Sequence, residues 1–198
     1  MRRARALVLI RGNNKPFLVA LSNDLTPDTP IFKLIEHDVI KAVADSYIGV
    51  FSRLDVLSLN LTLPVGSSSP IKSQRWHRDP EDRRQCKVFV YLTNVDEQSG
   101  PFFYAKKSLS KYKNFFKRKP PMGFYPEIGA VEKIISKEDI LECCGSIGTL
   151  IFADTTGLHK GGYATLKERV MIMAGYYSRA SNFPRKVKGV PASKNRLF

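Results

Sequence analysis

The sequence has few cysteines and no long apolar run, and these two shortages argue against a disulfide-rich secreted protein and against a membrane-spanning one. It has three cysteines, of which Cys143 and Cys144 are adjacent, and this gives no disulfide framework of the secreted kind. The absence of a Cys-x-x-Cys pair argues against a structural zinc site. No apolar run approaches the length of a membrane span. A reducing compartment is favoured, and we expect the protein in the cytoplasm.

The composition that remains is globular, with an unusual charge. The 198 residues, 43% of them apolar, suffice for one domain with a substantial core, so we predict a single domain over 1–198. The net charge of +14 is carried by the acid-free stretches 1–15, 104–126 and 179–198. The other 14 of the 32 basic residues share the rest of the chain with all 18 acidic ones. The basic stretches fit an anionic partner, but also two solvated tails and a solvated insert.

Short strands separated by turns dominate the pattern along the chain. Apolar residues at helical spacing predict an amphipathic helix over 31–51, and a capping pattern predicts a short helix from Ser136. Alternating, β-branched and aromatic runs predict strands at 17–21, 54–63, 87–95, 102–105, 148–152 and 168–177. With helices mostly at the front, the pattern favours a mainly β fold: an antiparallel sandwich or jelly roll with an N-terminal helical segment.

Two of the three histidines fall where predicted strands begin or end. His77 and Asp79 precede the strongest strand, and at strand spacing their side chains would face the same way. His159 follows the strand at 148–152, in a glycine-rich turn. Two imidazoles and one carboxylate on one side of a metal leave the other side open, as in non-haem Fe(II) oxygenases. The third histidine, His37, is expected on the surface of the predicted helix.

A single arginine begins the last apolar strand. Arg169 lies ten residues after His159, and the residues that follow it are almost all apolar. A guanidinium that enters such a strand needs a partner, and a carboxylate held by two parallel hydrogen bonds is the natural one. The alternative is an arginine that reaches water or pairs with Glu168. Behind a His-x-Asp pair and a distal histidine, the carboxylate clamp is favoured.

The spacing of these four residues resembles that of a known family. His77-x-Asp79, a second histidine 82 residues after the first and an arginine ten residues later are similar to the pattern of phytanoyl-CoA dioxygenase-like Fe(II)/2-oxoglutarate-dependent oxygenases. The stretches YLTNVDEQSGPFFYAKKSLSK and GSIGTLIFADTTGLHKGG also resemble that family, and the likeness covers roughly 55–178. Where the family often has a hydroxyl residue two positions after the distal histidine, this chain has Gly161.

The resemblance implies a double-stranded β-helix, with the basic stretches as an insert and a tail. It implies Fe(II) held by the two histidines and the carboxylate, 2-oxoglutarate as co-substrate, O₂ as oxidant, and hydroxylation of a small-molecule or anionic substrate. The distal carboxylate of 2-oxoglutarate would lie on Arg169. Tyr91 and Asn60 are further candidates for polar contacts with this co-substrate.

Two other classes of protein stay open at this point. A catalytically silent jelly-roll module could use the basic stretches to bind nucleic acid or another polyanion, and would need neither the triad nor Arg169. A hydrolase could hold a metal at the same triad, with Glu81 or Asp82 as general base. For an anionic substrate, the insert offers a set of lysines with interleaved aromatic residues: Lys106, Lys107, Lys111, Lys113, Tyr112, Phe115 and Phe116.

Overall fold

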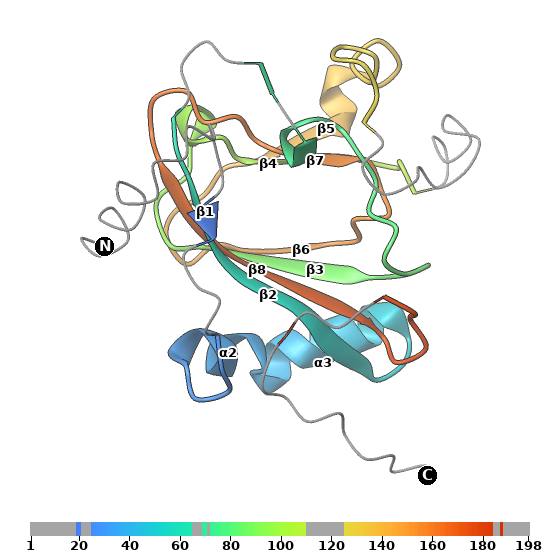
Figure 1. Ribbon diagram of the computed structural model, residues 1–198. Coiled ribbons are helices and arrows are strands. Elements are labelled where there is room, and N and C mark those ends of the chain that lie inside the picture. The colour runs from blue at the N-terminus through green and yellow to red at the C-terminus, as the bar shows by residue number, and fades with distance from the viewer. Residues whose placement is uncertain are drawn as a thin grey trace.

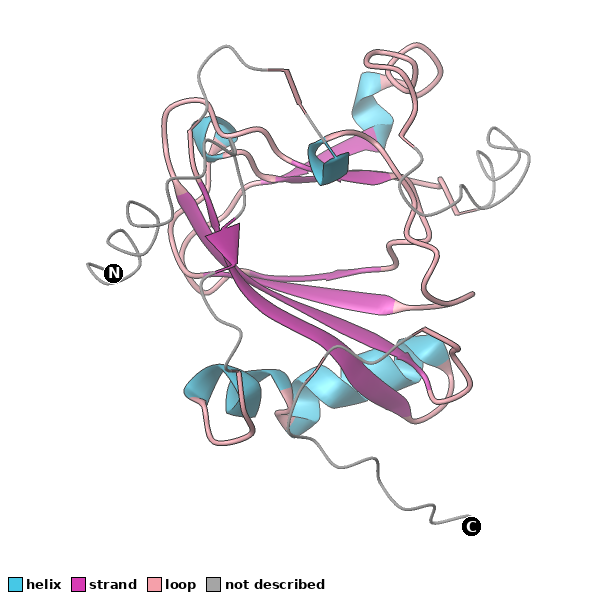
Figure 2. Cartoon of the chain, viewed as in Figure 1, coloured by secondary structure: helices cyan, strands magenta, loops and turns pink. Residues whose placement is uncertain are grey.

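Two antiparallel β-sheets lie face to face in the computed structural model of this chain (Figure 1). The structure describes residues 19–20, 25–64, 69–70, 72–109, 125–183 and 187. Within these residues the larger sheet has the strand order β1-β2-β8-β3-β6 and the smaller sheet the order β5-β4-β7. Figure 2 shows the two sheets as separate layers, with the longer helices outside the larger one. This is the predicted jelly-roll arrangement.

Six of the eight described strands lie close to the predicted ranges, whereas β5 and β7 were not predicted. The larger sheet consists of β1 (Val19–Ala20), β2 (Ser52–Thr62), β3 (Cys86–Tyr91), β6 (Leu150–Ala153) and β8 (Arg169–Ser178). The smaller sheet consists of β4 (Phe102–Ala105), β5 (Ile140–Cys143) and β7 (His159–Gly161). Single turns of 3-10 helix occur at η1 (Lys72–Gln74), η2 (Glu97–Ser99) and η4 (Lys137–Asp139). The short helix predicted from Ser136 is present only as the single turn η4, because Ser136 makes no side-chain capping hydrogen bond and Ile140 already pairs with β4.

The single helix predicted over 31–51 is in fact two helices, α2 (Pro30–Ile35) and α3 (Asp38–Ile48). The backbone of His37 is extended, and its ring nitrogen accepts a hydrogen bond from the Val39 N–H, so His37 caps α3. His37 is exposed, as predicted, but it lies at the start of α3 and not on one continuous helix. No helix in the described part of the chain combines the length and the apolar character that crossing a membrane requires.

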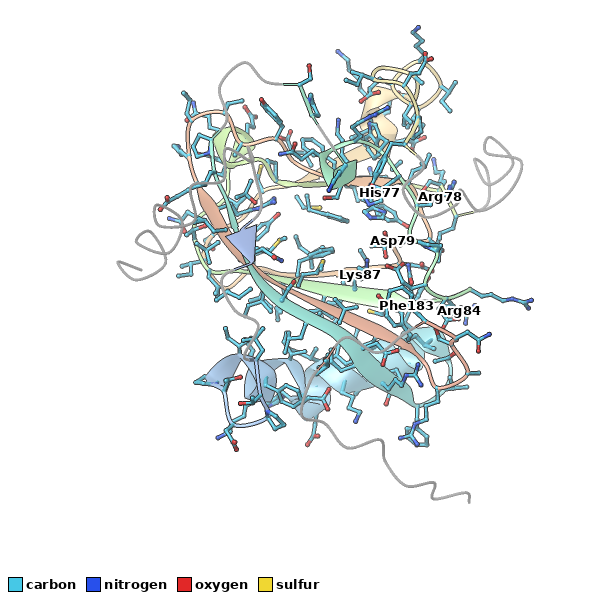
Figure 3. The ribbon with its side chains drawn as sticks, viewed as in Figure 1. His77, Arg78, Asp79, Arg84, Lys87 and Phe183 are labelled. Atoms are coloured by element: carbon cyan, nitrogen blue, oxygen red, sulfur yellow. The ribbon has the colours of Figure 1, made fainter. Side chains whose placement is uncertain are left out.

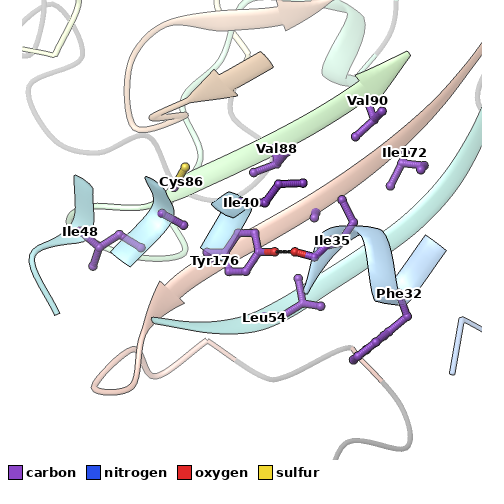
Figure 4. Close-up of a cluster of buried hydrophobic side chains, with 12 residues drawn as sticks. Phe32, Ile35, Ile40, Ile48, Leu54, Cys86, Val88, Val90, Ile172 and Tyr176 are labelled. Atoms are coloured by element: carbon purple, nitrogen blue, oxygen red, sulfur yellow. Dashed lines mark hydrogen bonds between the residues drawn. The ribbon is translucent and has the colours of Figure 1, made fainter. Parts of the chain in front are cut away.

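The two helices cover the outer face of the larger sheet (Figure 4). Ile35 of α2 and Ile40 of α3 are buried against side chains of β3 and β8, among them Val88 and Ala174. Each such apolar side chain contributes about 1.5–3 kcal/mol through burial. The Tyr176 hydroxyl also donates a hydrogen bond to the Ile35 carbonyl and so joins β8 to α2. Because side chains alternate along a strand, the intervening residues of β3 and β8 face the space between the sheets.

A second apolar cluster lies at the smaller sheet and supports the segment that carries His77. Trp76 is 5% exposed and packs among a set of apolar side chains. Its indole N–H donates a 2.6 Å hydrogen bond to Glu132. The neighbours of Trp76 in this cluster are Ala105, Val131, Ile135 and Leu158. Since Trp76 is held in this way, the residue after it is directed toward the space between the sheets.

Candidate functional site

His77 and His159 lie side by side because their backbones pair. The N–H of each residue donates to the carbonyl of the other, at 2.9 and 3.0 Å, in an isolated β-bridge. The two ring centroids are 4.2 Å apart. The backbone N–H of Asp79 is held by the Thr155 carbonyl at 2.8 Å. One ligand atom from each of His77, Asp79 and His159 lies within 4.8 Å of the others, so these three residues are brought together.

The nitrogen and oxygen atoms that face one another in this triad are all acceptors. The Nδ1 atom of His77 lies 2.8 Å from the Arg75 carbonyl, and that of His159 lies 3.0 Å from the Gly157 carbonyl. A carbonyl can only accept, so each Nδ1 carries the ring proton and each Nε2 has a free lone pair. These Nε2 atoms lie 3.6 and 3.2 Å from the Asp79 carboxylate. Acceptors at such distances repel each other unless a cation or a proton lies between them.

The protonation states of the triad suit a divalent metal. Burial lowers the pKa of His77 to about 3, with a further contribution from His159, so this imidazole is neutral at pH 7. Burial alone would raise the pKa of Asp79, but Lys87 and then His159 outweigh it and hold that pKa well below its ordinary value. At pH 7 the triad therefore offers a neutral imidazole at His77 and an ionised carboxylate at Asp79, and neither has a proton to displace when a metal binds.

Lys87 is the partner of the Asp79 carboxylate, a role that the sequence reasoning missed. Its side chain, on the inner face of β3, is 9% exposed, and its ammonium lies 2.6 Å from Asp79 Oδ2 and 3.6 Å from Glu81 Oε1. Burial opposes the charge of Lys87, but the two carboxylates outweigh this and raise its pKa. In Figure 3, Asp79 lies between His77 and Lys87, in the space between the two sheets.

Arg169 begins β8 and is 2% exposed. Its guanidinium donates to the Gly100 carbonyl and, at 3.2 Å, to the Thr62 hydroxyl. Its Nε has no hydrogen-bond partner, and no carboxylate of the described residues acts on it. Burial lowers the pKa of Arg169, and the Tyr91 hydroxyl opposes this only in part. The alternative explanations for Arg169, that its guanidinium reaches water or pairs with Glu168, therefore do not explain its position.

The backbone around Arg169 is packed closely by glycines. Gly100 has a φ of +69°, and a Cβ on Gly162 would lie 2.2 Å from the Gly100 carbonyl carbon. Only residues without a Cβ allow the two backbones to approach in this way. The Gly100 carbonyl is thereby placed where Arg169 can bind it, and the guanidinium is held in a fixed position.

A cavity of about 270 Å³ joins the triad to Arg169. Arg169 pairs with Thr62 of β2, whereas Lys87 pairs with Gly175, six residues farther along β8. At about 3.3 Å per residue, the backbone positions at Arg169 and opposite Lys87 lie roughly 20 Å apart along the strand, and both long side chains line the cavity between them. Between them the walls are largely apolar and include Phe89, Phe102, Met171 and Met173. A cavity of this size takes a small molecule, or only the reacting part of a larger one.

The other predicted contact residues have different surroundings. Asn60 lines the cavity and donates a 2.8 Å hydrogen bond to Ser58. Tyr91 is fully buried behind the cavity wall, with its hydroxyl donating to the Cys143 carbonyl at 2.7 Å and lying against Arg169. Thr62 was missed, although it provides a hydroxyl at Arg169 where Gly161 provides none. Its signal was the shared face with Asn60 on one predicted strand.

Most of the basic insert lies outside the described residues, including Lys111, Lys113, Tyr112, Phe115 and Phe116. Two of its lysines are described. Lys106 donates to the Glu138 carbonyl at 3.0 Å, and Lys107 lies 3.2 Å from Asp139. Both therefore bind the η4 turn, and neither lines the cavity. The prediction that these two lysines face a substrate is not supported.

The fold has relatives among solved structures, whereas the sequence alone finds none. No protein-family model matches the chain, and no curated protein matches its sequence. EctD from S. alaskensis, solved with 2-oxoglutarate and 5-hydroxyectoine, superposes with a TM-score of 0.62 at 19% identity, over 96% of this chain and 72% of that one. The epimerase SnoN, solved with Fe³⁺, alpha ketoglutarate and nogalamycin RO, gives 0.59 at 16% identity, over 98% and 81%.

A second SnoN structure, described as a non-heme alpha ketoglutarate dependent epimerase from nogalamycin biosynthesis, gives a TM-score of 0.53 at 16% identity. That match covers 82% of this chain and 64% of the epimerase, so this chain spans slightly less than two thirds of its length. At such identities the likeness establishes the fold and nothing finer. The structural neighbours are non-haem iron enzymes that depend on 2-oxoglutarate, and the predicted jelly-roll fold is confirmed.

Proposed function

We propose that this protein is an Fe(II)- and 2-oxoglutarate-dependent oxygenase that hydroxylates its substrate. The main support is the cavity, which joins a triad of two histidines and one carboxylate to a buried arginine with an unpartnered Nε. Solved neighbours of the same fold contain these ligands: SnoN with Fe³⁺ and alpha ketoglutarate, and EctD with 2-oxoglutarate. The spacing that resembles phytanoyl-CoA dioxygenase-like enzymes agrees with this assignment.

The triad residues fit iron by the chemistry of their atoms. His77 and His159 offer Nε2 lone pairs, and Asp79 offers an ionised carboxylate. Mixed imidazole and carboxylate ligands on one side of the metal are typical of non-haem Fe(II) oxygenases. Bound iron would supply the oxidative decarboxylation of 2-oxoglutarate and, with O₂, the oxidation of a substrate C–H bond. The Arg75 and Gly157 carbonyls hold the imidazoles in the orientation that ligation needs.

Arg169 fits the distal carboxylate of 2-oxoglutarate. A guanidinium binds a carboxylate through two parallel hydrogen bonds, and here one of its donors is without a partner. Thr62 and Gly100 fix its position, so little conformational freedom would be lost on binding. Phe102 and Met171 form part of the apolar wall that excludes water from the space between arginine and triad. Asn60, on the same wall, stays a candidate for a further polar contact.

The proposal can be tested on the purified protein under anaerobic conditions. Addition of Fe(II) and 2-oxoglutarate is expected to produce a weak visible charge-transfer band, and His77→Ala is expected to lose it with the metal. Arg169→Lys keeps the charge but loses the planar pair of donors, so 2-oxoglutarate affinity should fall about tenfold or more while Fe(II) affinity stays unchanged. Arg84→Lys, an exposed arginine, is the matched control and should behave like the wild type.

Two outcomes would contradict the assignment. A protein that binds metal but shows no band, and whose metal affinity does not respond to 2-oxoglutarate, would favour the hydrolase with Glu81 or Asp82 as base. A protein that binds neither ligand, yet binds nucleic acid with a steep dependence on salt, would favour the silent module. If 2-oxoglutarate affinity is undiminished in Arg169→Ala, the carboxylate binds elsewhere.

A further inference from the structure

The end of the cavity remote from Arg169 contains a carboxylate that the proposed reaction does not use. Glu81 lies two residues after Asp79, its side chain is 13% exposed, and it lines the same cavity as the triad. Its Oε2 atom is buried without a hydrogen-bond partner among the described residues. Leaving a buried acceptor unsatisfied destabilises the folded state, and the effect is larger for a charged group. Such an atom calls for a specific explanation, and a ligand that donates to it is one.

The charges around Glu81 favour a cationic ligand. The short hydrogen bond of Lys87 goes to Asp79 at 2.6 Å, while Glu81 is 3.6 Å away. Arg78 is directed elsewhere, because its guanidinium donates to the carbonyls of Thr156 and Ser108. The Oε2 atom of Glu81 therefore remains a carboxylate oxygen without a donor among the described residues, which a cationic donor would satisfy.

Tyr177 adds a second buried polar group without a partner. It is fully buried, and its hydroxyl has no hydrogen-bond partner among the described residues. Gly175, the pairing partner of Lys87, leaves room for this hydroxyl, because a Cβ there would lie 2.7 Å from it. Burial and then the charge of Glu81 raise the pKa of Tyr177, so the hydroxyl stays protonated and able to donate. Glu81 and Tyr177 together offer both an acceptor and a hydroxyl.

Glu81 can also be approached from outside the cavity. Pro80 and Glu81 line both the cavity of the triad and an open groove bordered by Arg84 and Phe183. Figure 3 shows Arg84 and Phe183 at the outer edge of the molecule, next to the side that holds Asp79 and Lys87. A small molecule could therefore reach Glu81 from this groove while the Arg169 end is occupied.

We propose that Glu81, with the Tyr177 hydroxyl, forms a recognition site for an aliphatic ammonium group on the molecule that is oxidised at the triad. An ammonium would donate a charge-assisted hydrogen bond to the unpartnered Oε2. The role of this molecule as substrate rests on the proposed function, but its binding at Glu81 does not. The Lys87 ammonium lies between Glu81 and Asp79. An ammonium group of the ligand at Glu81 would therefore be near the triad without contacting Asp79.

The binding can be measured with three probes of one chain length: hexylamine, hexan-1-ol and hexanoate. Ligand-observed NMR titrations would be run with Zn(II) and saturating 2-oxoglutarate, so that the triad and Arg169 are both occupied and bind neither the amine nor hexanoate. Hexylamine is expected to bind the wild type at least about tenfold more tightly than either other probe. This is the affinity difference that one charge-assisted hydrogen bond provides. Glu81→Gln should lose about tenfold or more in amine affinity, whereas the exposed control Glu127→Gln should keep wild-type affinity.

Each result decides the question. Preference for hexanoate, or equal amine affinity in the wild type and Glu81→Gln, overturns the inference. Should Glu81→Gln fail to fold, the preference of the wild type among the three probes and the weaker amine binding expected of Glu81→Asp still test it. The 2-oxoglutarate band, recorded on the same variants with Fe(II), is expected to persist in Glu81→Gln. A wild type that shows a normal band but no preference for the amine thus rejects this site alone, and a wild type that prefers the amine but shows no band rejects the proposed oxygenase alone.

Discussion

The two ends of the cavity each contain a buried cation, but in opposite circumstances. Lys87 has Asp79 at 2.6 Å and Glu81 at 3.6 Å. Arg169 has a carbonyl and two hydroxyls, from Gly100, Thr62 and Tyr91, and no carboxylate among the described residues. Burial opposes both charges, yet the pKa of Lys87 is raised and that of Arg169 is lowered.

This difference separates a cation that belongs to the folded protein from one that requires a ligand. A buried charge with a close partner is costly to disrupt, because removing one member leaves the other uncompensated. A buried charge without a partner raises the free energy of the folded state, and a bound anion would lower it again. Substitution of the two cations by the same apolar residue should therefore have opposite consequences for stability.

The largest expected effect is at Lys87. Lys87→Met would leave Asp79 and Glu81 close together without their cation, and the free energy of unfolding should fall by about 3–5 kcal/mol at pH 7. Urea denaturation of the metal-free protein would measure it. The double variant Lys87→Met/Glu81→Gln should recover part of the loss. Lys107→Met, which removes a lysine that is 67% exposed and pairs with Asp139, should change stability by less than about 1 kcal/mol.

The next largest effect is the pH dependence of the free energy of unfolding that arises from His77, which lines the cavity between Lys87 and Arg169. The pKa of His77 is about 3 in the folded protein, lowered by burial and by His159, against about 6.5 unfolded. The unfolded chain thus binds a proton that the folded one does not, so stability should fall as pH decreases from about 6.5 toward 3. Between pH 6 and 4 this amounts to about 2–3 kcal/mol in the metal-free protein.

Denaturation curves at several pH values would show this contribution as a difference between variants. His77→Gln removes the titrating group and should have a smaller dependence on pH over that interval. Ser73→Ala, which also lines the cavity but removes no ionisable group, should keep the wild-type dependence. Identical dependence in all three proteins would mean that His77 is protonated in the folded state.

Arg169→Met should show the opposite sign to Lys87→Met. Without ligand, removal of a buried guanidinium that lacks a carboxylate should leave stability unchanged or raise it by about 1 kcal/mol, since the Gly100 and Thr62 hydrogen bonds are lost at the same time. Urea denaturation with and without 2-oxoglutarate in excess provides the measurement. The wild type should be stabilised by the ligand and the variant should not. A loss of about 3 kcal/mol in the absence of ligand would mean that Arg169 already has an anionic partner.

The four residues that the sequence singled out and that line one cavity in the structure share one property: their spacing along the chain is itself the signal. His77 and Asp79 are two residues apart, and His159 and Arg169 stand at strand ends in distinct local contexts. The β-rich pattern also predicted the fold, because alternation and turns are local. The break between α2 and α3 at His37 was missed because the apolar periodicity continues across it, and an extended backbone at a single residue suffices to end one helix and start another.

The residues that were missed depend on pairing between distant strands. Thr62 meets Arg169 only because β2 and β8 pair in that register. Lys87 shares the inner face of β3 with Phe89, so alternation placed it correctly, but a lysine at the start of a strand is usually solvated. Its partner Asp79 comes from a loop whose path no local pattern specifies. Such contacts follow from tertiary structure, and they provide most of the electrostatics of the site.

The smallest expected effect tests the Thr62 hydroxyl, the contact that distinguishes Arg169 from an arginine held by backbone alone. Thr62→Val preserves the shape of the side chain and removes the acceptor that lies 3.2 Å from the guanidinium. One such hydrogen bond contributes about 1 kcal/mol, so 2-oxoglutarate affinity should fall about fivefold while Fe(II) affinity is unchanged. Thr165→Val, at an exposed threonine bonded to the Gln98 carbonyl, is the control and should match the wild type. Anaerobic titration of the visible band would measure both. Wild-type affinity in Thr62→Val would mean that Gly100 and the cavity walls orient Arg169 without help from β2.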